Sequence, residues 1–251
     1  MDWATNADTA SLSAVLGLVA GWFVPRLVAV LPEPTAPKGS DADGSDADGS
    51  DSVDDQKPLY ADLAATPGIA RWTAGWTGLV AGLFGAALGW AWPLLYLLPL
   101  VPIGVALAWV DARTRLLPRI VVLPTYLLVL VLIPLTALLA RDLDALVRAG
   151  LGWLAVGFVY WFLWRFTPGM GYGDVRLSGI LGMALGFLGW AELVVGAYAG
   201  FLIGALGWVP LRLLRITRDR NFPFGPFMLL GAVVGVLWGA DLGGYLAGRQ
   251  G

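Results

Sequence analysis

The sequence predicts an all-α protein, a polytopic membrane helix bundle with about eight transmembrane helices. Of its 251 residues, 58% are hydrophobic and only 14% are charged, whereas a soluble domain carries roughly 25% charged residues. The mean hydropathy is +0.73. The apolar residues also gather in runs of about 20 residues, the length that crosses a bilayer as a helix. These observations together exclude a soluble globular domain.

Eight apolar runs follow one another along the chain and are the candidate helices. The first lacks a basic start and continues past Pro25 and Arg26 without a small-residue cleavage site, so we do not interpret it as a cleaved signal peptide. We divide the chain into a first transmembrane helix (1–31), an acidic loop (32–71) and a membrane-embedded domain (72–251). The runs cover about 11–31, 72–92, 94–110, 120–140, 149–166, 177–191, 193–211 and 222–240.

The acidic loop contains the repeat SDADGSDADGSD at residues 40–51. A segment of this composition buries too little apolar area to offset its ordering entropy, so we expect disorder. A calcium-binding loop is the alternative. It fits poorly, because Asp46 stands where such a loop needs its sharp-turn glycine and no glutamate closes it.

The basic residues predict the orientation of the bundle, since Lys and Arg concentrate in cytoplasmic loops. With the N-terminus outside and eight helices, 13 of the 16 Lys and Arg residues lie on the inside. The outside then keeps Arg141, Arg148 and Arg249. Adding or removing one helix would mix the basic loops between the two sides, so the charges support the count of eight.

Glycine recurs every fourth residue in several of the predicted helices. In lipid this spacing lets helix backbones approach closely. We therefore assign these glycines to the packing of the bundle rather than to chemistry. They are Gly78, Gly82, Gly85, Gly89, Gly182, Gly186, Gly196, Gly200, Gly204, Gly231, Gly235 and Gly239.

Two acidic residues, Asp111 and Asp174, each lie where an apolar helix meets the predicted inner face. The chain has no histidine and no cysteine, which removes disulfides, thiolate metal sites and the commonest general base. Two carboxylates held close together share a proton, so one activates water while the other donates a proton. In the alternative, purely structural interpretation, Asp111 pairs with Arg113 or Arg115, and Asp174 pairs with Arg176.

The segment GMGYGDVRL, residues 169–177, surrounds the second acid with glycines. Gly169, Gly171 and Gly173 permit backbone conformations closed to other residues, and a backbone without side chains lets a substrate strand approach. Irregular backbone at membrane depth is tolerated where it lines a wet cavity. We therefore expect a water-accessible pocket beside Asp174.

Three motifs in order resemble the type IV prepilin peptidases, which are GxGD-type membrane aspartyl proteases. The first is DARTRLLPRIVVLP from Asp111, and the second is GMGYGD, which ends at Asp174 with Arg176 where the family usually has Lys. The third is PFGPF at residues 223–227. The first helix resembles the family weakly. The strong resemblance covers about residues 94–240.

The resemblance implies a membrane aspartic endopeptidase that removes the leader from type IV pilin-like or pseudopilin precursors. Its partners would be precursors with a basic leader and a hydrophobic helix, together with membrane lipid, and no nucleic acid. Residues 72–251 would form the peptidase domain of a multi-pass protein of the cytoplasmic membrane, with the active site facing the cytoplasm. Proteolysis would need no cofactor or metal. Some members also N-methylate the product with S-adenosylmethionine.

The resemblance assigns roles residue by residue. Asp111 and Asp174 would be the catalytic pair, and Gly171 and Gly173 would shape the backbone beside Asp174. The remaining candidates would orient the substrate, tune the acids or border the cleft: Arg113, Arg115, Arg176, Phe224, Gly225 and Pro226. Their alternative roles are positive-inside anchoring for the arginines and a helix-start turn for residues 224–226.

Larger members of the family carry zinc-binding CxxC pairs after the first helix, and this chain has none. We still expect cleavage, because it depends on the two aspartates, which are present. For methyl transfer, the sequence contains no recognisable cofactor-binding loop. Two other classes stay open: a transporter or channel that uses both acids as proton or cation sites, and a catalytically silent membrane scaffold. The placement of both acids at one face, rather than at mid-membrane, favours the protease.

Overall fold

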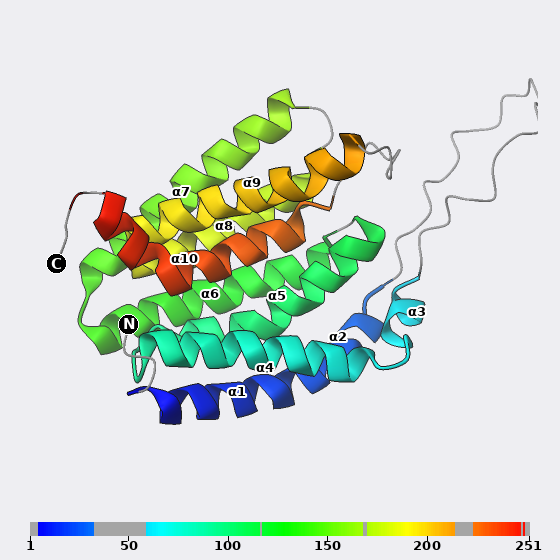
Figure 1. Ribbon diagram of the computed structural model, residues 1–251, viewed down its shortest axis with the longest axis horizontal. Helices are drawn as coiled ribbons and strands as arrows, with labels where there is room; N and C mark the ends of the chain where they lie inside the picture. Colours follow the sequence, from blue (N-terminus) through cyan, green and yellow to red (C-terminus); the bar gives the residue numbers. More distant parts are fainter. Residues whose placement is uncertain are drawn as a thin grey trace, which may run out of the picture.

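The computed structural model describes residues 5–32, 59–115, 117–167, 170–213, 223–246 and 248. Within these ranges the regular secondary structure is helical throughout (Figure 1), as predicted. The helices in chain order are α1 Ala7–Trp22, α2 Val24–Ala29, α3 Tyr60–Ala64, α4 Ile69–Leu88, α5 Leu94–Thr114, α6 Arg119–Ala140, α7 Leu143–Phe166, α8 Tyr172–Leu188, α9 Trp190–Leu213 and α10 Gly225–Leu246.

Six helical segments of the described chain are long and apolar enough to cross a membrane: Ala7–Ala29, Leu94–Thr114, Arg119–Ala140, Leu143–Phe166, Trp190–Gly207 and Gly225–Tyr245. The protein is therefore a multi-pass membrane protein. The other two predicted spans correspond to α4, which mixes its aliphatic residues with Trp, Thr and Gly, and to α8, which has 17 residues and carries two charged side chains. A count of eight crossings stays a prediction.

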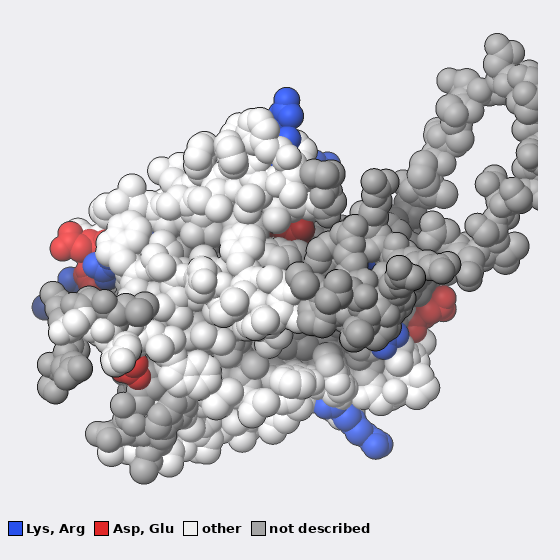
Figure 2. All heavy atoms as spheres, turned by 45° about the horizontal axis from the view of Figure 1, so that its top comes forward, with Lys and Arg blue, Asp and Glu red and all other residues white. Residues whose placement is uncertain are grey.

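The lipid-facing character of the surface is visible in Figure 2, where most of the described face is free of charged residues. Large apolar side chains are exposed along the outer helices, for example Leu127 on α6, Phe158 on α7 and Val194 on α9. In water this surface would be unstable, but in a bilayer it contacts lipid tails at no cost.

Glycines lie at the closest helix contacts, as their spacing predicts. The helices form tight pairs, α1 with α4, α7 with α8 and α9 with α10, and the first pair runs along the lower edge of Figure 1. A Cβ added at Gly17 would lie 2.6 Å from the Thr77 carbonyl oxygen, and one at Gly231 would lie 2.5 Å from that of Gly196. These contacts leave no room for larger residues.

The acidic loop is shorter at its C-terminal end than the range 32–71 expected from sequence. Helix α3 lies within that range, and its Tyr60 and Leu63 are buried against Val28 of α2 and Val110 of α5. Burying these two apolar side chains favours order over the disorder of a polar segment. The acidic repeat itself and the alternative calcium loop lie outside the described residues.

Two tyrosines, the buried Tyr96 and the partly buried Tyr126, fix the position of α8 in the bundle. The Tyr96 hydroxyl of α5 donates to the Ala184 carbonyl at 2.8 Å, and the Tyr126 hydroxyl of α6 donates to the Arg176 carbonyl at 2.7 Å. A buried hydroxyl needs such a partner, and each bond holds one level of α8 against a neighbouring helix. The first turn of α8, which carries Asp174, is thereby held against α6.

Candidate active site

Asp111 lies in the last turn of α5 and is 4% exposed. Its Oδ2 accepts a hydrogen bond of 2.9 Å from the backbone amide of Gly225, the first residue of α10. Amides in the first turn of a helix have no partner within the helix, and they carry a partial positive charge that favours a carboxylate. The start of α10 therefore holds the carboxylate of Asp111.

Gly225 is required at this contact for reasons of space. A Cβ at position 225 would lie 2.7 Å from Oδ2 of Asp111, closer than a carbon and an oxygen normally approach. Any larger residue would push the carboxylate and the helix start apart. The sequence predicts that Gly225 borders a cleft but gives no sign of this direct contact.

Asp174 is the third residue of α8 and is 6% exposed. Its Oδ2 accepts from the Gly171 amide at 3.2 Å, while its own amide donates to the Gly171 carbonyl at 3.1 Å. This reciprocal arrangement satisfies two backbone groups at the start of the helix. Asp174 is thus fixed by its own helix, and Asp111 by a helix from another part of the chain.

The two carboxyl groups are close enough for the charge of Asp111 to act on Asp174. The fold therefore brings together the two acids that the sequence singled out, at the ends of α5 and α8. Two buried carboxylates so placed do not both ionise readily, because their charges repel and water is excluded. Such a pair can share one proton, which is the arrangement that acid–base catalysis by two carboxyl groups requires.

The glycines of the GMGYGD segment act by their size rather than by unusual backbone angles. Gly171 has φ −77° and ψ 145°, which any residue adopts, and Gly173 is helical. The expectation of backbone conformations closed to other residues is therefore wrong for these two positions. A Cβ at Gly173 would lie 2.8 Å from the Leu117 side chain, so this glycine permits close packing. Gly169 lies outside the described residues.

Two of the three arginines of the predicted site lie against aromatic rings. The Arg113 guanidinium is 4.3 Å from the Trp109 ring centre, and that of Arg176 is 4.7 Å from the Tyr172 ring centre. The described residues contain no ion pair between Asp111 and Arg113 or between Asp174 and Arg176, which weakens the purely structural interpretation of the two acids. Arg115 ends α5 in the left-handed conformation, with φ 56°.

Phe224 packs in an aromatic cluster that sequence reasoning missed. Its ring centre lies 5.3 Å from that of Phe201 and 6.1 Å from that of Tyr160. Tyr160 is 2% exposed and is close enough to Asp174 to interact with its charge. The run YWFLWRF offered no signal that distinguishes Tyr160 from its aromatic neighbours, because only the fold buries it against Phe201 and Phe224.

Comparison with known proteins identifies the family of this chain. The model of the type IV leader peptidase family matches residues 98–240, more than half of the chain. This chain belongs to the type IV leader peptidase family. The matched range includes Asp111, Asp174 and Gly225, and thus both carboxylates and the helix start that holds one of them. No solved structure gave a significant match.

Several relatives in the type IV leader peptidase family carry the name prepilin leader peptidase/N-methyltransferase. That of Stutzerimonas stutzeri is 36% identical over 175 residues, which cover 66% of this chain and 57% of the relative. That of Pseudomonas aeruginosa is 34% identical over 169 residues, with the same coverage. That of Dickeya chrysanthemi is 31% identical over 191 residues, or 71% and 64%. The chain thus spans somewhat more than half the length of these curated relatives.

The arrangement found in this member of the type IV leader peptidase family suits acid–base chemistry. Two carboxyl groups share a buried site at one end of the bundle, each fixed by a backbone amide. One can accept a proton from water while the other donates one to a carbonyl oxygen or leaving amine. Among the described residues, no three acidic side chains gather in a way that could hold a metal ion.

Proposed function

We propose that this chain is a membrane aspartic endopeptidase that cleaves the leader from type IV pilin-like or pseudopilin precursors. The observation that carries the proposal is the burial of two carboxyl groups, Asp111 and Asp174, each with one oxygen bound by a backbone amide at a helix start. The precursor would present a basic leader followed by a hydrophobic helix. Membership of the leader peptidase family supports this substrate class.

In the proposed reaction, a water molecule attacks the carbonyl carbon of the scissile peptide. The ionised carboxylate removes a proton from that water, and the protonated carboxyl donates its proton to the carbonyl oxygen. The tetrahedral intermediate collapses as a proton passes to the leaving nitrogen, so the peptide bond is hydrolysed without His, Cys or metal. The amides of Gly171 and Gly225 contribute by holding both acids in one orientation.

We place the active site at the cytoplasmic face of the cytoplasmic membrane. The support is the concentration of Lys and Arg in the loops on the side of the bundle where α5 ends and α8 and α10 begin. The same placement argues against the transporter alternative. A proton or cation pathway needs acids near mid-membrane, while Asp111 and Asp174 both lie in terminal turns.

Methyl transfer forms no step of this proposal, although the relatives are named N-methyltransferases as well. S-adenosylmethionine carries a carboxylate, an ammonium group and ribose hydroxyls, which need polar partners when buried. The cavity between α4, α5, α8 and α10 is lined by apolar side chains. That cavity does not fit the cofactor.

The test is proteolysis by the purified protein of a synthetic precursor, with products identified by mass spectrometry. Asp111→Asn and Asp174→Asn should each lower kcat by roughly 10²- to 10⁴-fold, the usual effect of general acid–base catalysis. Asp144→Asn, on the exposed first turn of α7, is the matched control and should keep full activity. Cleavage by either Asn variant at the normal rate, or none by the parent protein, would overturn the proposal.

A further inference from the structure

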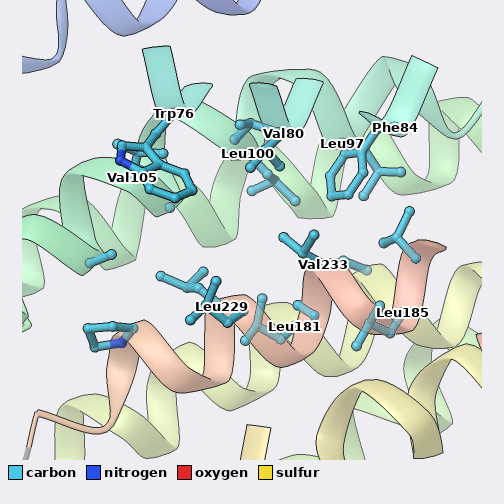
Figure 3. A pocket seen from close by; sticks show the side chains of 18 of the residues that line it. Trp76, Val80, Phe84, Leu97, Leu100, Val105, Leu181, Leu185, Leu229 and Val233 are labelled. Carbon is cyan, nitrogen blue, oxygen red and sulfur yellow. The ribbon is translucent and has the colours of Figure 1, made fainter. Parts of the chain in front are cut away.

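An apolar groove lies between α4 and α5 on one side and α10 on the other, with α8 at its floor (Figure 3). Its volume is about 280 Å³. Figure 3 shows side chains from both walls pointing toward each other across it. We refer to this space as the intramembrane groove; its central lining residues are Val80, Leu100, Leu181, Leu229 and Val233.

One end of the intramembrane groove lies beside the two acids. Pro226 lines the groove and directly follows Gly225, whose amide holds Asp111. On the opposite wall, Ala108 lines the groove one helical turn before Asp111. From Pro226 to Val236, both lining residues, α10 extends for ten residues, or about 15 Å. The groove therefore leads from the carboxylates into the depth of the membrane.

The chemistry of the lining restricts what the groove can hold. Each lining residue is apolar or aromatic. Charged side chains, or backbone amide and carbonyl groups without hydrogen bonds, would therefore lose their hydration in the groove without finding partners. A basic leader is excluded for that reason. An apolar segment of a polypeptide, with its backbone satisfied as a helix, meets no such cost.

The size of the groove decides how such a helix would sit. A volume of about 280 Å³ suits a row of side chains rather than a whole helix, which with its side chains is about 10 Å wide. The groove therefore receives the side chains of one helix face, which recur at every third or fourth residue. The opposite face would remain in lipid. Trp72 and Trp76, which line the groove and are partly exposed, form its rim.

We propose that the intramembrane groove binds the hydrophobic helix that follows the scissile bond of the precursor. This inference rests on the proposed function and adds a substrate-binding surface to it. A peptide bond at Asp111 and Asp174 has its leader on the water side, and the chain after the cut enters the groove directly. A phospholipid is the competing occupant. Its phosphate would lie beside the negatively charged acid pair, where repulsion disfavours it.

The test fills the groove and compares two substrates. Val233→Trp places a large ring in the groove, toward which Val233 points in Figure 3. Val194→Trp is the matched control, because Val194 on α9 is 63% exposed and does not line the groove. The substrates are a full precursor and a short peptide that ends a few residues after the scissile bond. The quantity compared is the ratio of their kcat/KM values.

We expect Val233→Trp to lower the ratio of precursor to peptide kcat/KM at least tenfold, mainly through KM for the precursor. Val194→Trp should keep the ratio within twofold of the parent protein. An unchanged ratio in Val233→Trp would contradict the role of the groove in binding the precursor, but would not contradict the proposed protease activity. Cleavage of neither substrate by the parent protein would instead contradict the proposed function, so the two failures are distinguishable.

A crosslinking measurement covers the outcome in which Val233→Trp does not fold. A photoreactive phenylalanine analogue at Leu229, in the cleavage-deficient Asp174→Asn background, should crosslink to the hydrophobic segment of a bound precursor. The same analogue at Val194 should not. Crosslinks from position 229 to phospholipid alone, with precursor present in excess, would identify a lipid site and contradict the inference.

Discussion

The amide of Gly225 donates to Oδ2 of Asp111 at 2.9 Å, although the two residues are 114 positions apart in the chain. This contact joins the end of α5 to the start of α10 and fixes one carboxylate of the pair. It also explains why the PFGPF segment belongs to the site. The Phe224 carbonyl accepts from the amides of Phe227 and Met228 at 3.1 Å where α10 begins, and the glycine leaves room for the acid.

Gly225→Ala should therefore impair cleavage while the protein still inserts. The added Cβ would lie 2.7 Å from Oδ2 of Asp111 and would displace the carboxylate from its amide. A hydrogen bond to a charged group contributes about 1.5–3 kcal/mol, so kcat/KM should fall roughly 10- to 150-fold. Gly150→Ala is the matched control, since nothing lies within 4 Å of a Cβ there. Equal activity of the two variants would refute the contact's role.

The double variant Asp111→Asn/Asp174→Asn should cleave no more slowly than either single variant. If the two carboxyl groups act as one unit, removal of either partner already abolishes the proton transfer, and the second loss adds nothing. The measurement is the single-turnover rate of the three variants on one precursor. Multiplicative rate losses would mean that the acids act independently.

Tyr160→Phe should lower kcat modestly, by about fivefold, without lowering the melting temperature. The ring would keep its packing against Phe201 and Phe224, while the hydroxyl that interacts with Asp174 would be lost. A change of about 1 kcal/mol in the electrostatic environment of the carboxylates corresponds to this factor. Phe201→Leu, which changes the packing but not the hydroxyl, is the comparison. A rate loss only in Phe201→Leu would show that Tyr160 matters for packing alone.

The orientation of the bundle can be tested with cysteines, because the chain has none of its own. Ala112→Cys should react with a membrane-impermeant thiol reagent from the cytoplasmic side, and Asp144→Cys from the opposite side. Both positions are exposed, while the neighbouring Thr114 and Ala145 are buried and would label poorly. Labelling of position 112 from outside would invert the orientation.

The helical fold and the placement of Asp111 and Asp174 at helix ends were predictable because each depends on a local pattern. Long apolar runs define the helices, and a single acid at the end of such a run is conspicuous in a chain without His or Cys. The same reasoning failed for α3, whose Tyr60 and Leu63 are ordered by contacts with Val28 and Val110. Those contacts are distant in sequence, so composition alone predicted a loop there.

The role of Tyr160 and the direct contact of Gly225 with Asp111 could not be read from the sequence for a related reason. Both depend on how helices from separate parts of the chain meet in space. The stacking of Arg113 and Arg176 on aromatic rings was equally unpredictable. In the sequence, carboxylates and aromatic rings are equally near to each arginine. Periodicity predicts which face of a helix is apolar, but not which neighbour that face meets.

The packing of α2 against α3 bears on how this protein tolerates change. These short helices precede and follow the acidic segment in sequence and contact each other, so the described residues on its two sides lie close together. Closing a segment between fixed, neighbouring ends costs only about 0.6 kcal/mol more for each doubling of its length. The position between α2 and α3 is therefore suited to exchange: a fluorescent reporter or an entire accessory module could be spliced in there while Asp111 and Asp174 keep their geometry.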